Sequence, residues 1–168
     1  MAIEIERTFL VAADSWRARA HRSVEMAQGY LNDAESVVLG RQNASVRVRL
    51  EGDEARLNIK SREMGAARQE FDYRIPVEDA RALLALCVGG TVVKRPHYVL
   101  NEGHEWEVDE FFGDNAGRIV AELERGSLDE TFDLPSWAGP EVTHLQRYYN
   151  LNLASHPFSR WSAEEREE

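Results

Sequence analysis

Alternation of apolar and polar residues with a period of two constrains the fold of this chain more than any other feature of its sequence. In residues 3–10, at the amino terminus, the odd positions point to one side of a β-strand and the even positions, which include Glu4 and Glu6, point to the other. The two carboxylates therefore share a face and lie roughly 7 Å apart. On its own such a pair is typical of the half-solvated face of an antiparallel sheet, so its meaning depends on the rest of the chain.

The same alternation predicts seven further strands. They cover residues 24–31, 45–50, 55–60, 68–75, 91–100, 105–112 and 118–124. Gly29 indicates a bulge or a close backbone approach, and Gly65 marks a loop over residues 61–67. The apolar run 36–40 is read as a short strand or an insertion. Eight strands of this spacing predict an α+β protein dominated by antiparallel sheet, and they suit one closed or nearly closed barrel.

Few helices are expected beside these strands. After Pro76, apolar residues at three-four spacing predict a core-facing helix over residues 77–87. Residues 13–20 are expected to form a short helix or an ordered loop, and residues 141–153 a helix. The charged end from Trp161 to Glu168 is the kind of terminus that frays.

The charge balance and the cysteine count exclude some classes of function. The 168 residues carry 20 Lys and Arg against 30 Asp and Glu, a formal net charge of -10, so a broad surface for nucleic acid or an anionic membrane is not expected. The single cysteine, Cys87, excludes an intramolecular disulfide and is expected to be a core residue. Since no apolar run suits a signal peptide or a transmembrane helix, a cytoplasmic protein is the default expectation.

The polar faces of the predicted strands carry charges of both signs in blocks. An acid-x-acid pair recurs on three strands, as Glu4 and Glu6, Glu107 and Asp109, and Glu122 and Glu124. The bases on these faces are Arg47, Arg49, Lys60, Arg68 and Arg95. Solvent-exposed strand faces also collect charges, but they do not show such repeated pairing. Carboxylate oxygens are the ligands that Mg²⁺ and Mn²⁺ prefer, and the two acids of a pair such as Glu4 and Glu6 are close enough to serve one divalent ion or a pair of ions.

A series of motifs in order resembles the CYTH superfamily, also called triphosphate tunnel metalloenzymes. The matching motifs are EIERTFLV from Glu4, QGYL from Gln28, VRVRL from Val46, LNIKS from Leu57, RQEFDYRI from Arg68, WEVDEF from Trp106, AELE from Ala121 and QRYYN from Gln146. The resemblance covers residues 3 to about 153 and is closest to small bacterial inorganic triphosphatases. It implies a CYTH domain over residues 1–155 and a charged C-terminal tail over residues 156–168.

The resemblance implies a fold, a reaction and a set of site residues. The implied fold is an eight-stranded antiparallel β-barrel that forms a tunnel, with polar faces inward and helices packed outside. The implied metal ligands are Glu4, Glu6, Glu122 and Glu124, with Glu107 and Asp109 for a second ion or its waters. The implied phosphate-binding residues are Arg47, Arg49, Lys60, Arg68, Arg95 and His97, and Tyr30 and Lys60 take catalytic roles. The implied reaction is hydrolysis of a triphosphate-containing small molecule with Mg²⁺ or Mn²⁺, and a homodimer is left open.

Two positions depart from the family pattern. The amino-terminal signature normally ends in a lysine that pairs with the tyrosine at position 30, but this chain has Thr8, which offers a hydroxyl and no positive charge. The family's Lys-x-Arg-Tyr segment aligns best with Arg95 and His97. An alternative register would use Lys94, whose side chain should face outward by parity if Arg95 faces inward.

Four readings of the function stay open. The first is a metal-dependent triphosphatase. The second is a protein that binds a polyphosphate or nucleotide without turnover, because the signature lysine is absent. The third is activity on ATP like that of class four adenylate cyclases. The fourth is an interaction module in which the interior charges only pair with one another, although buried ion pairs are poor stability devices.

Overall fold

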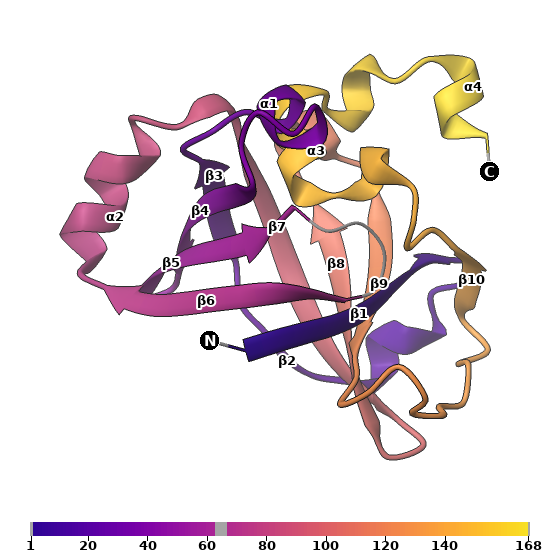
Figure 1. Cartoon of the computed structure of the whole chain (residues 1–168). Helices are drawn as coiled ribbons and strands as arrows, with labels where there is room; N and C mark the ends of the chain where they lie inside the picture. The colour runs from indigo at the N-terminus through magenta and orange to yellow at the C-terminus, as the bar shows by residue number, and fades with distance from the viewer. Residues whose placement is uncertain (1, 63–66, 168) are drawn as a thin grey trace.

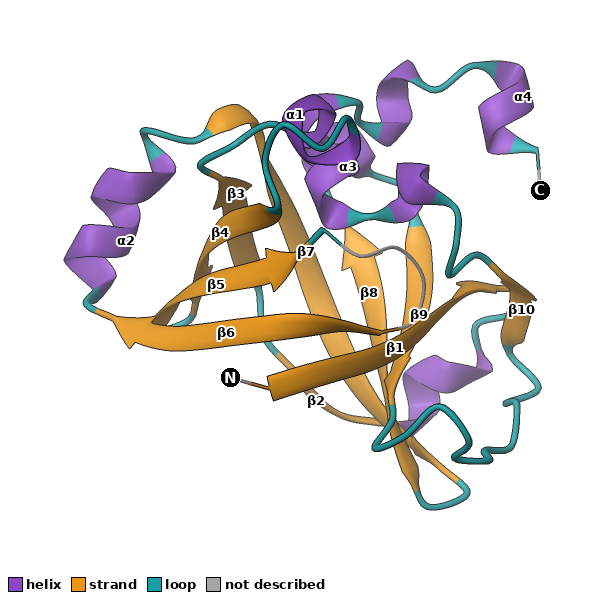
Figure 2. Cartoon of the chain, viewed as in Figure 1, coloured by secondary structure: helices purple, strands orange, loops and turns teal. Residues whose placement is uncertain are grey.

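The computed structural model describes residues 2–62 and 67–167, and its main feature is a closed antiparallel barrel (Figures 1 and 2). The eight barrel strands are β1 (Ala2–Val11), β3 (Met26–Tyr30), β4 (Ala44–Glu51), β5 (Glu54–Ser61), β6 (Ala67–Ile75), β7 (Val88–Asn101), β8 (His104–Phe111) and β9 (Ile119–Glu124). Their order is β1-β6-β5-β4-β3-β7-β8-β9, and the pairing of β9 with β1 closes the barrel. Closure leaves every barrel strand with two neighbours, and it confirms the predicted fold class.

Short elements surround the barrel. Two additional strands, β2 (Ala20–Ser23) and β10 (Ala138–Glu141), pair with β7 and β1. The helices are α1 (Ala34–Val38), α2 (Val77–Leu84), α3 (Asn150–Ser155) and α4 (Ala163–Arg166), and the 3-10 helices are η1 (Ser15–Arg19), η2 (Gly113–Asn115), η3 (Gln146–Tyr148) and η4 (Phe158–Arg160). In the described part of the chain, no helix has the length and apolar character needed to span a membrane.

Two apolar clusters lie on the outer surface of the barrel. Helix α2 covers β4 and β5, and Ala80 of the helix packs with Val48 and Ala55 of the strands, as the three-four spacing after Pro76 predicts. A larger aromatic cluster, which includes Phe9 and Trp106, lies between the outer face of β1, β7, β8 and β9 and the segments that cover it. Apolar residues therefore point outward on these strands, which leaves the inner face for polar side chains.

Strand β3 approaches the link between α2 and β7 so closely that glycine is required at position 29. A Cβ on Gly29 would lie 2.8 Å from Cys87 Sγ and 3.0 Å from Cys87 Cβ. The pairing of β3 with β7 also shifts register between Gln28 and Tyr30. Gly29 thus combines the bulge and the close approach that the sequence indicates. Cys87, which was expected to be a core residue, is half-buried rather than fully buried.

A Gly29→Ala substitution is expected to lower the free energy of unfolding by about 1–3 kcal/mol, because the new methyl group overpacks against Cys87. Urea denaturation measures this change. Gly126→Ala is the matched control, since the nearest atom to its Cβ is Glu130 Oε2 at 4.0 Å, and it should leave stability within about 0.5 kcal/mol of the wild type. Equal effects of the two substitutions would show that the contact with Cys87 is not restrictive.

The C-terminal segment closes one end of the barrel interior. Tyr148, Leu153 and Trp161 pack in one buried cluster. The barrel strands contribute Val92 of β7, Phe111 of β8 and Val120 of β9 to the same cluster. Figure 1 shows α3 lying over this end of the barrel, beside α1. The apolar cluster blocks this end, and the polar part of the barrel interior begins beneath it.

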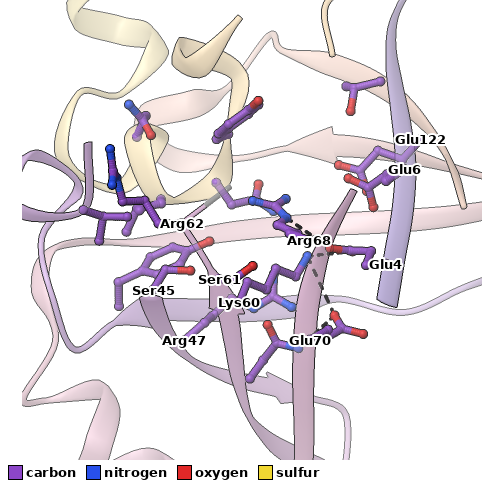
Figure 3. Close-up of a pocket in the computed structure, with 18 of the residues that line it drawn as sticks. Glu4, Glu6, Ser45, Arg47, Lys60, Ser61, Arg62, Arg68, Glu70 and Glu122 are labelled. Atoms are coloured by element: carbon purple, nitrogen blue, oxygen red, sulfur yellow. Dashed lines mark hydrogen bonds and ion pairs between the residues drawn. The ribbon is translucent and has the colours of Figure 1, made fainter. Parts of the chain in front are cut away.

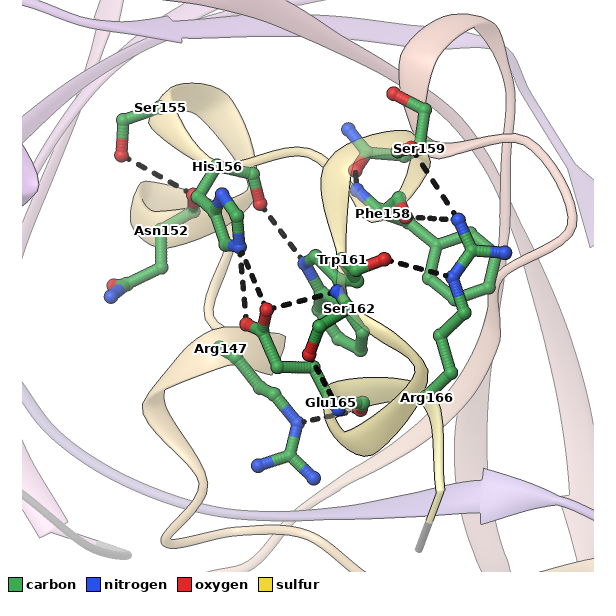
Figure 4. Close-up of polar contacts among 11 residues, drawn as sticks. Arg147, Asn152, Ser155, His156, Phe158, Ser159, Trp161, Ser162, Glu165 and Arg166 are labelled. Carbon is green, nitrogen blue, oxygen red and sulfur yellow. Dashed lines mark hydrogen bonds and ion pairs between the residues drawn. The ribbon is translucent and has the colours of Figure 1, made fainter.

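Polar contacts order the last helices (Figure 4). Trp161 Nε1 donates to the carbonyl oxygen of His156 at 3.1 Å, and Arg147 Nε donates to the carbonyl oxygen of Glu165 at 3.1 Å. Ser162 and Glu165 form a reciprocal capping box at the start of α4. The described part of this end, to residue 167, is therefore packed and capped rather than frayed. The division of the chain at residue 155 stays a prediction.

Some predicted elements differ from the structure. The run 36–40 is not a strand: residues 36–38 belong to the helical insertion α1 and residues 39–40 form the turn that follows it. Asp33, the cap of α1, accepts a hydrogen bond from the Ser36 amide at 2.7 Å. The helix expected over residues 141–153 begins only at Asn150, because the chain first adds β10 to β1 and then forms η3. The loop glycine Gly65 lies outside the described residues.

Candidate active site

The inner faces of the strands enclose a charged cavity of about 800 Å³. The charged residues that line it are Glu4, Glu6, Glu70, Asp72, Glu107, Glu122, Glu124, Arg47, Arg49, Lys60, Arg62, Arg68 and Lys94. Acids come mainly from β1, β8 and β9, and bases mainly from β4, β5 and β6. Figure 3 shows both groups pointing into the same space. The alternation in the sequence therefore places its polar faces inside the barrel.

Acids of β1 and β9 lie against one another. Glu6 is the register partner of Glu124, and Thr8 is the partner of Glu122; Figure 3 shows Glu6 and Glu122 side by side. Burial and the Glu122 carboxylate raise the pKa of Glu6 well above its usual range, and burial also raises the pKa of Glu122 and of Glu124. These three acids form no ion pair with a Lys or Arg of residues 2–62 and 67–167, so their charge favours an added cation.

Glu4 has cations of the protein itself beside it. Lys60 Nζ lies 2.8 Å from Glu4 Oε1, and Arg68 Nε lies 3.2 Å from Glu4 Oε2. Burial alone would raise the pKa of Glu4, but Lys60 and Arg68 outweigh it and hold that pKa below its ordinary value. Lys60 Nζ also lies 3.8 Å from Glu70 Oε2. Glu4 is therefore the point where the acidic and basic sides of the cavity meet.

Arg47 is a buried cation with a donor available to a ligand. Its side chain lies near Tyr30, and the residue is 8% exposed. Burial lowers the pKa of Arg47, but Tyr30, Glu4 and other acids outweigh this effect and raise it, so the guanidinium stays charged. Its Nε atom is buried and has no hydrogen-bond partner in the described part of the chain. A buried donor of this kind is costly unless a ligand accepts from it.

Strand β7 presents Lys94 to the cavity, which corrects the predicted register. Lys94 is 3% exposed, and its Nζ lies 2.5 Å from Asp109 Oδ2 and 3.6 Å from Glu107 Oε2. Burial alone would raise the pKa of Glu107, but Lys94 lowers it to about 2. Burial and the Glu107 charge raise the pKa of Asp109 well above its usual value.

The predicted phosphate-binding residues Arg95 and His97 do not line the cavity. Arg95 Nη2 lies 3.5 Å from Glu25 Oε2, and His97 Nε2 lies 3.2 Å from Glu110 Oε1. The preferred register, with Arg95 facing inward, is wrong by one residue, and the alternative register that uses Lys94 is the one in the structure. The reason is cross-strand pairing: Pro96 is the partner of Asp109, and paired residues point to the same side of a sheet. The side that holds Asp109 and Glu107 therefore also holds Lys94.

The cavity brings together the other predicted residues. Those that line it are Tyr30, Arg47, Arg49, Lys60, Arg68, Glu4, Glu6, Glu107, Glu122 and Glu124. Asp109 is fully buried beside Lys94. Sequence reasoning missed Arg62, Glu70 and Asp72, although they share the parity of Lys60 and Arg68 and could have been found. Tyr149 and Asn150 belong to the QRYYN motif but were assigned no role, and no sequence pattern indicated Thr143, Leu151 or Asn152; all of them reach the cavity only through the fold.

The acids suit a divalent ion. Among the described residues, Glu107, Asp109 and Glu122 each offer an oxygen atom, and these atoms lie within 4.8 Å of one another. Lys94 already pairs with Glu107 and Asp109, which leaves Glu122 of this group for an ion. Glu6 and Glu124 add further carboxylates on neighbouring strands. Carboxylate oxygens from several strands are the donor set that a hard divalent cation takes, so the residues present fit such an ion.

A closed barrel with paired acids opposite arginines and lysines defines a class of protein that holds a polyanion with the help of cations. The model of the CYTH domain matches residues 2–155, and the chain belongs to the CYTH domain family.

Relatives agree with this assignment. The chain is 36% identical over 162 residues to an inorganic triphosphatase of Acetivibrio thermocellus, which covers 96% of this chain and 99% of the relative. A crystal structure of an inorganic triphosphatase superimposes with a TM-score of 0.63 at 32% identity, covering 90% of this chain and 97% of the other. A protein from Hippeastrum, named for adenylyl cyclase and described with a dominant triphosphatase activity, gives a TM-score of 0.58 at 14% identity, covering 76% and 80%. This last likeness shows the fold alone.

Proposed function

We propose that this protein is a metal-dependent triphosphatase that hydrolyses inorganic tripolyphosphate, or another molecule ending in a triphosphate, inside the barrel. The observation that carries the proposal is one cavity in which the acids of β1 and β9 face the bases of β4 to β6. Similarity to an inorganic triphosphatase over nearly the whole chain supports it. Hydrolases of this family use a divalent metal, and Mg²⁺ or Mn²⁺ is the ion proposed here.

The acids and bases take complementary roles in this proposal. Glu6, Glu122 and Glu124, with Glu4, would hold the metal. A bound divalent ion supplies charge neutralisation and a more acidic water at the attacked phosphate. Arg47, Arg49, Lys60 and Arg68 bind the phosphate oxygens, and the arginines do so with paired donors.

Substrate binding changes the pairing that the ligand-free cavity shows. Lys60 and Arg68 donate to Glu4 in the absence of a phosphate. A phosphate oxygen would compete for the same donors, which would leave Glu4 available to hold the metal together with Glu6, Glu122 and Glu124. Lys60 then stabilises charge that develops during the reaction, and Tyr30 is proposed to orient the attacking water through its hydroxyl. Positioning and charge stabilisation account for most of the rate in phosphoryl transfer.

The other readings receive less support. An interaction module needs interior charges that only pair with one another, but Glu6, Glu122 and Glu124 form no ion pair with a Lys or Arg of the described residues, and Arg47 Nε has no partner there. Activity on ATP is supported only by a likeness of fold. A cytoplasmic location and a homodimer stay predictions.

One assay tests the proposed function. Purified protein with Mn²⁺ or Mg²⁺ and tripolyphosphate should release phosphate well above a Glu6→Gln control. A parallel sample with ATP is examined for cyclic AMP. Phosphate release without cyclic AMP supports the triphosphatase, whereas cyclic AMP supports the cyclase reading. Binding of tripolyphosphate without any release contradicts the proposal and supports binding without turnover.

A Lys60→Ala substitution is expected to raise KM and lower kcat together, each by about tenfold, because a charge contact strengthens as the leaving phosphate develops charge. Steady-state kinetics with tripolyphosphate measure both constants. Lys60→Arg, which keeps the charge, should restore part of the loss. Unchanged kcat and KM in Lys60→Ala would remove Lys60 from the phosphate site.

A further inference from the structure

Both lysines of the sequence line the cavity. The chain contains two lysines, Lys60 and Lys94, and both side chains contribute to the wall of the charged cavity. Lysine is among the residues least often buried in proteins. Lys94 is nevertheless 3% exposed. Its position is therefore specific and calls for a partner of opposite charge.

The ammonium of Lys94 lies beside two acids of a compact group of three. Glu107, Asp109 and Glu122 have oxygen atoms that all lie within 4.8 Å of one another. Lys94 Nζ lies 2.5 Å from Asp109 Oδ2 and 3.6 Å from Glu107 Oε2. A divalent ion at this place would bind the same oxygens at about 2.1 Å. Two cations cannot share them without strong repulsion.

The acids of the cavity thus fall into two sets. Glu4, Glu70, Asp72, Glu107 and Asp109 each have a cation of the protein beside them. Glu6, Glu122 and Glu124 form no ion pair with a Lys or Arg of residues 2–62 and 67–167. An added divalent ion gains more from the second set, because there it neutralises charge that the protein itself leaves unbalanced.

We propose that the Lys94 ammonium takes the place of a second divalent ion at Glu107 and Asp109, so that the cavity binds one divalent ion per chain, at the acids of β1 and β9. The inference rests on the proposed function, which requires one such ion. It differs from the implied use of Glu107 and Asp109 for a second ion or its waters. Lys94 is a fixed cation that supports the acidic side of the cavity whether or not substrate is present.

Counting bound ions tests the inference. Mn²⁺ is titrated into the metal-free protein, without triphosphate, and the stoichiometry is measured by calorimetry. The wild type is expected to bind one Mn²⁺ per chain. Lys94→Met, which keeps the length of the side chain and removes its charge, is expected to bind two. Arg81→Met is the matched control, because Arg81 is an exposed cation on α2, and it is expected to bind one.

The outcomes separate this inference from the proposed function. Two Mn²⁺ ions in the wild type, or only one in a folded Lys94→Met, would overturn the role of Lys94 and leave the triphosphatase proposal intact. A wild type that binds no Mn²⁺ in the presence or absence of tripolyphosphate would overturn the proposed function, and the present inference with it.

A second measurement covers the case in which Lys94→Met fails to fold. Since the chain has two lysines, wild-type protein labelled with ¹⁵N-lysine gives few side-chain ammonium signals, and that of Lys94 is assigned by comparison with Lys60→Arg. The Lys94 signal should persist and stay protected from solvent exchange when Mg²⁺ saturates the protein. Loss of that protection on addition of Mg²⁺ would show that the ion displaces Lys94, and would overturn the inference.

Discussion

Replacing Glu6 by glutamine is expected to lower the turnover of tripolyphosphate by about 10³-fold, which corresponds to about 4 kcal/mol of transition-state stabilisation. Glu6 lies on the inner face of β1 next to Glu122. Glutamine keeps the size of the side chain but removes the negative charge that would hold the metal. Phosphate release at saturating Mn²⁺ measures the effect.

The fold of the Glu6→Gln protein should be retained. Glu6 and Glu122 repel each other in the metal-free cavity, so loss of one charge is expected to leave the melting temperature of the metal-free protein equal to or above that of the wild type. Glu54→Gln is the control, because Glu54 forms an exposed ion pair with Arg74 and does not line the cavity; its turnover should be unchanged. Near wild-type turnover in Glu6→Gln would contradict the metal assignment.

Replacing Arg47 by alanine is expected to lower kcat/KM by about 10²-fold to 10³-fold, the effect of removing one charged donor from a site where transition-state charge develops. Arg47 is buried, lines the cavity and keeps an Nε donor without a partner in the described residues. Its guanidinium can donate two parallel hydrogen bonds to one phosphate. Kinetics with tripolyphosphate measure the loss.

Two further substitutions show whether the shape or only the charge of Arg47 is used. Arg47→Lys should recover a minor part of the activity, because an ammonium is a point charge without the paired donors of arginine. Arg74→Ala removes an exposed arginine of β6 and should leave kcat/KM unchanged. Circular dichroism establishes that each variant is folded. The assignment of Arg47 would be abandoned if Arg47→Ala retained the wild-type kcat/KM.

The strands of the barrel were predictable because side chains on a strand alternate strictly. All eight barrel strands occur where the alternation placed them, with shifts of a few residues at their ends. Glu4 and Glu6 on β1 and Arg47 and Arg49 on β4 reached the same cavity for this reason. A short local run is less informative: the residues around Val37 have the apolar character of a strand, but the Asp33 cap and the packing of α1 made them helical.

Site residues were predictable where it was enough to know which positions of one strand share a face. Arg95 and Lys94 illustrate the limit, because they are adjacent and either can face inward when the register is unknown. The pairing of Pro96 with Asp109 selected Lys94. An alignment to the Lys-x-Arg-Tyr motif carries no information about that pairing, so it assigned Arg95 and His97 to phosphate.

The sequence by itself determined where the eight barrel strands form, which residues share a face, and that acids and bases would collect on the polar faces, since these properties depend only on local alternation. The tertiary structure alone decided that the barrel closes through β1 and β9, that Lys94 rather than Arg95 enters the cavity, and that Tyr149 and its neighbours reach it from the C-terminal segment. These properties depend on hydrogen-bond register and on packing between residues far apart in the chain, and neither is encoded in a local pattern.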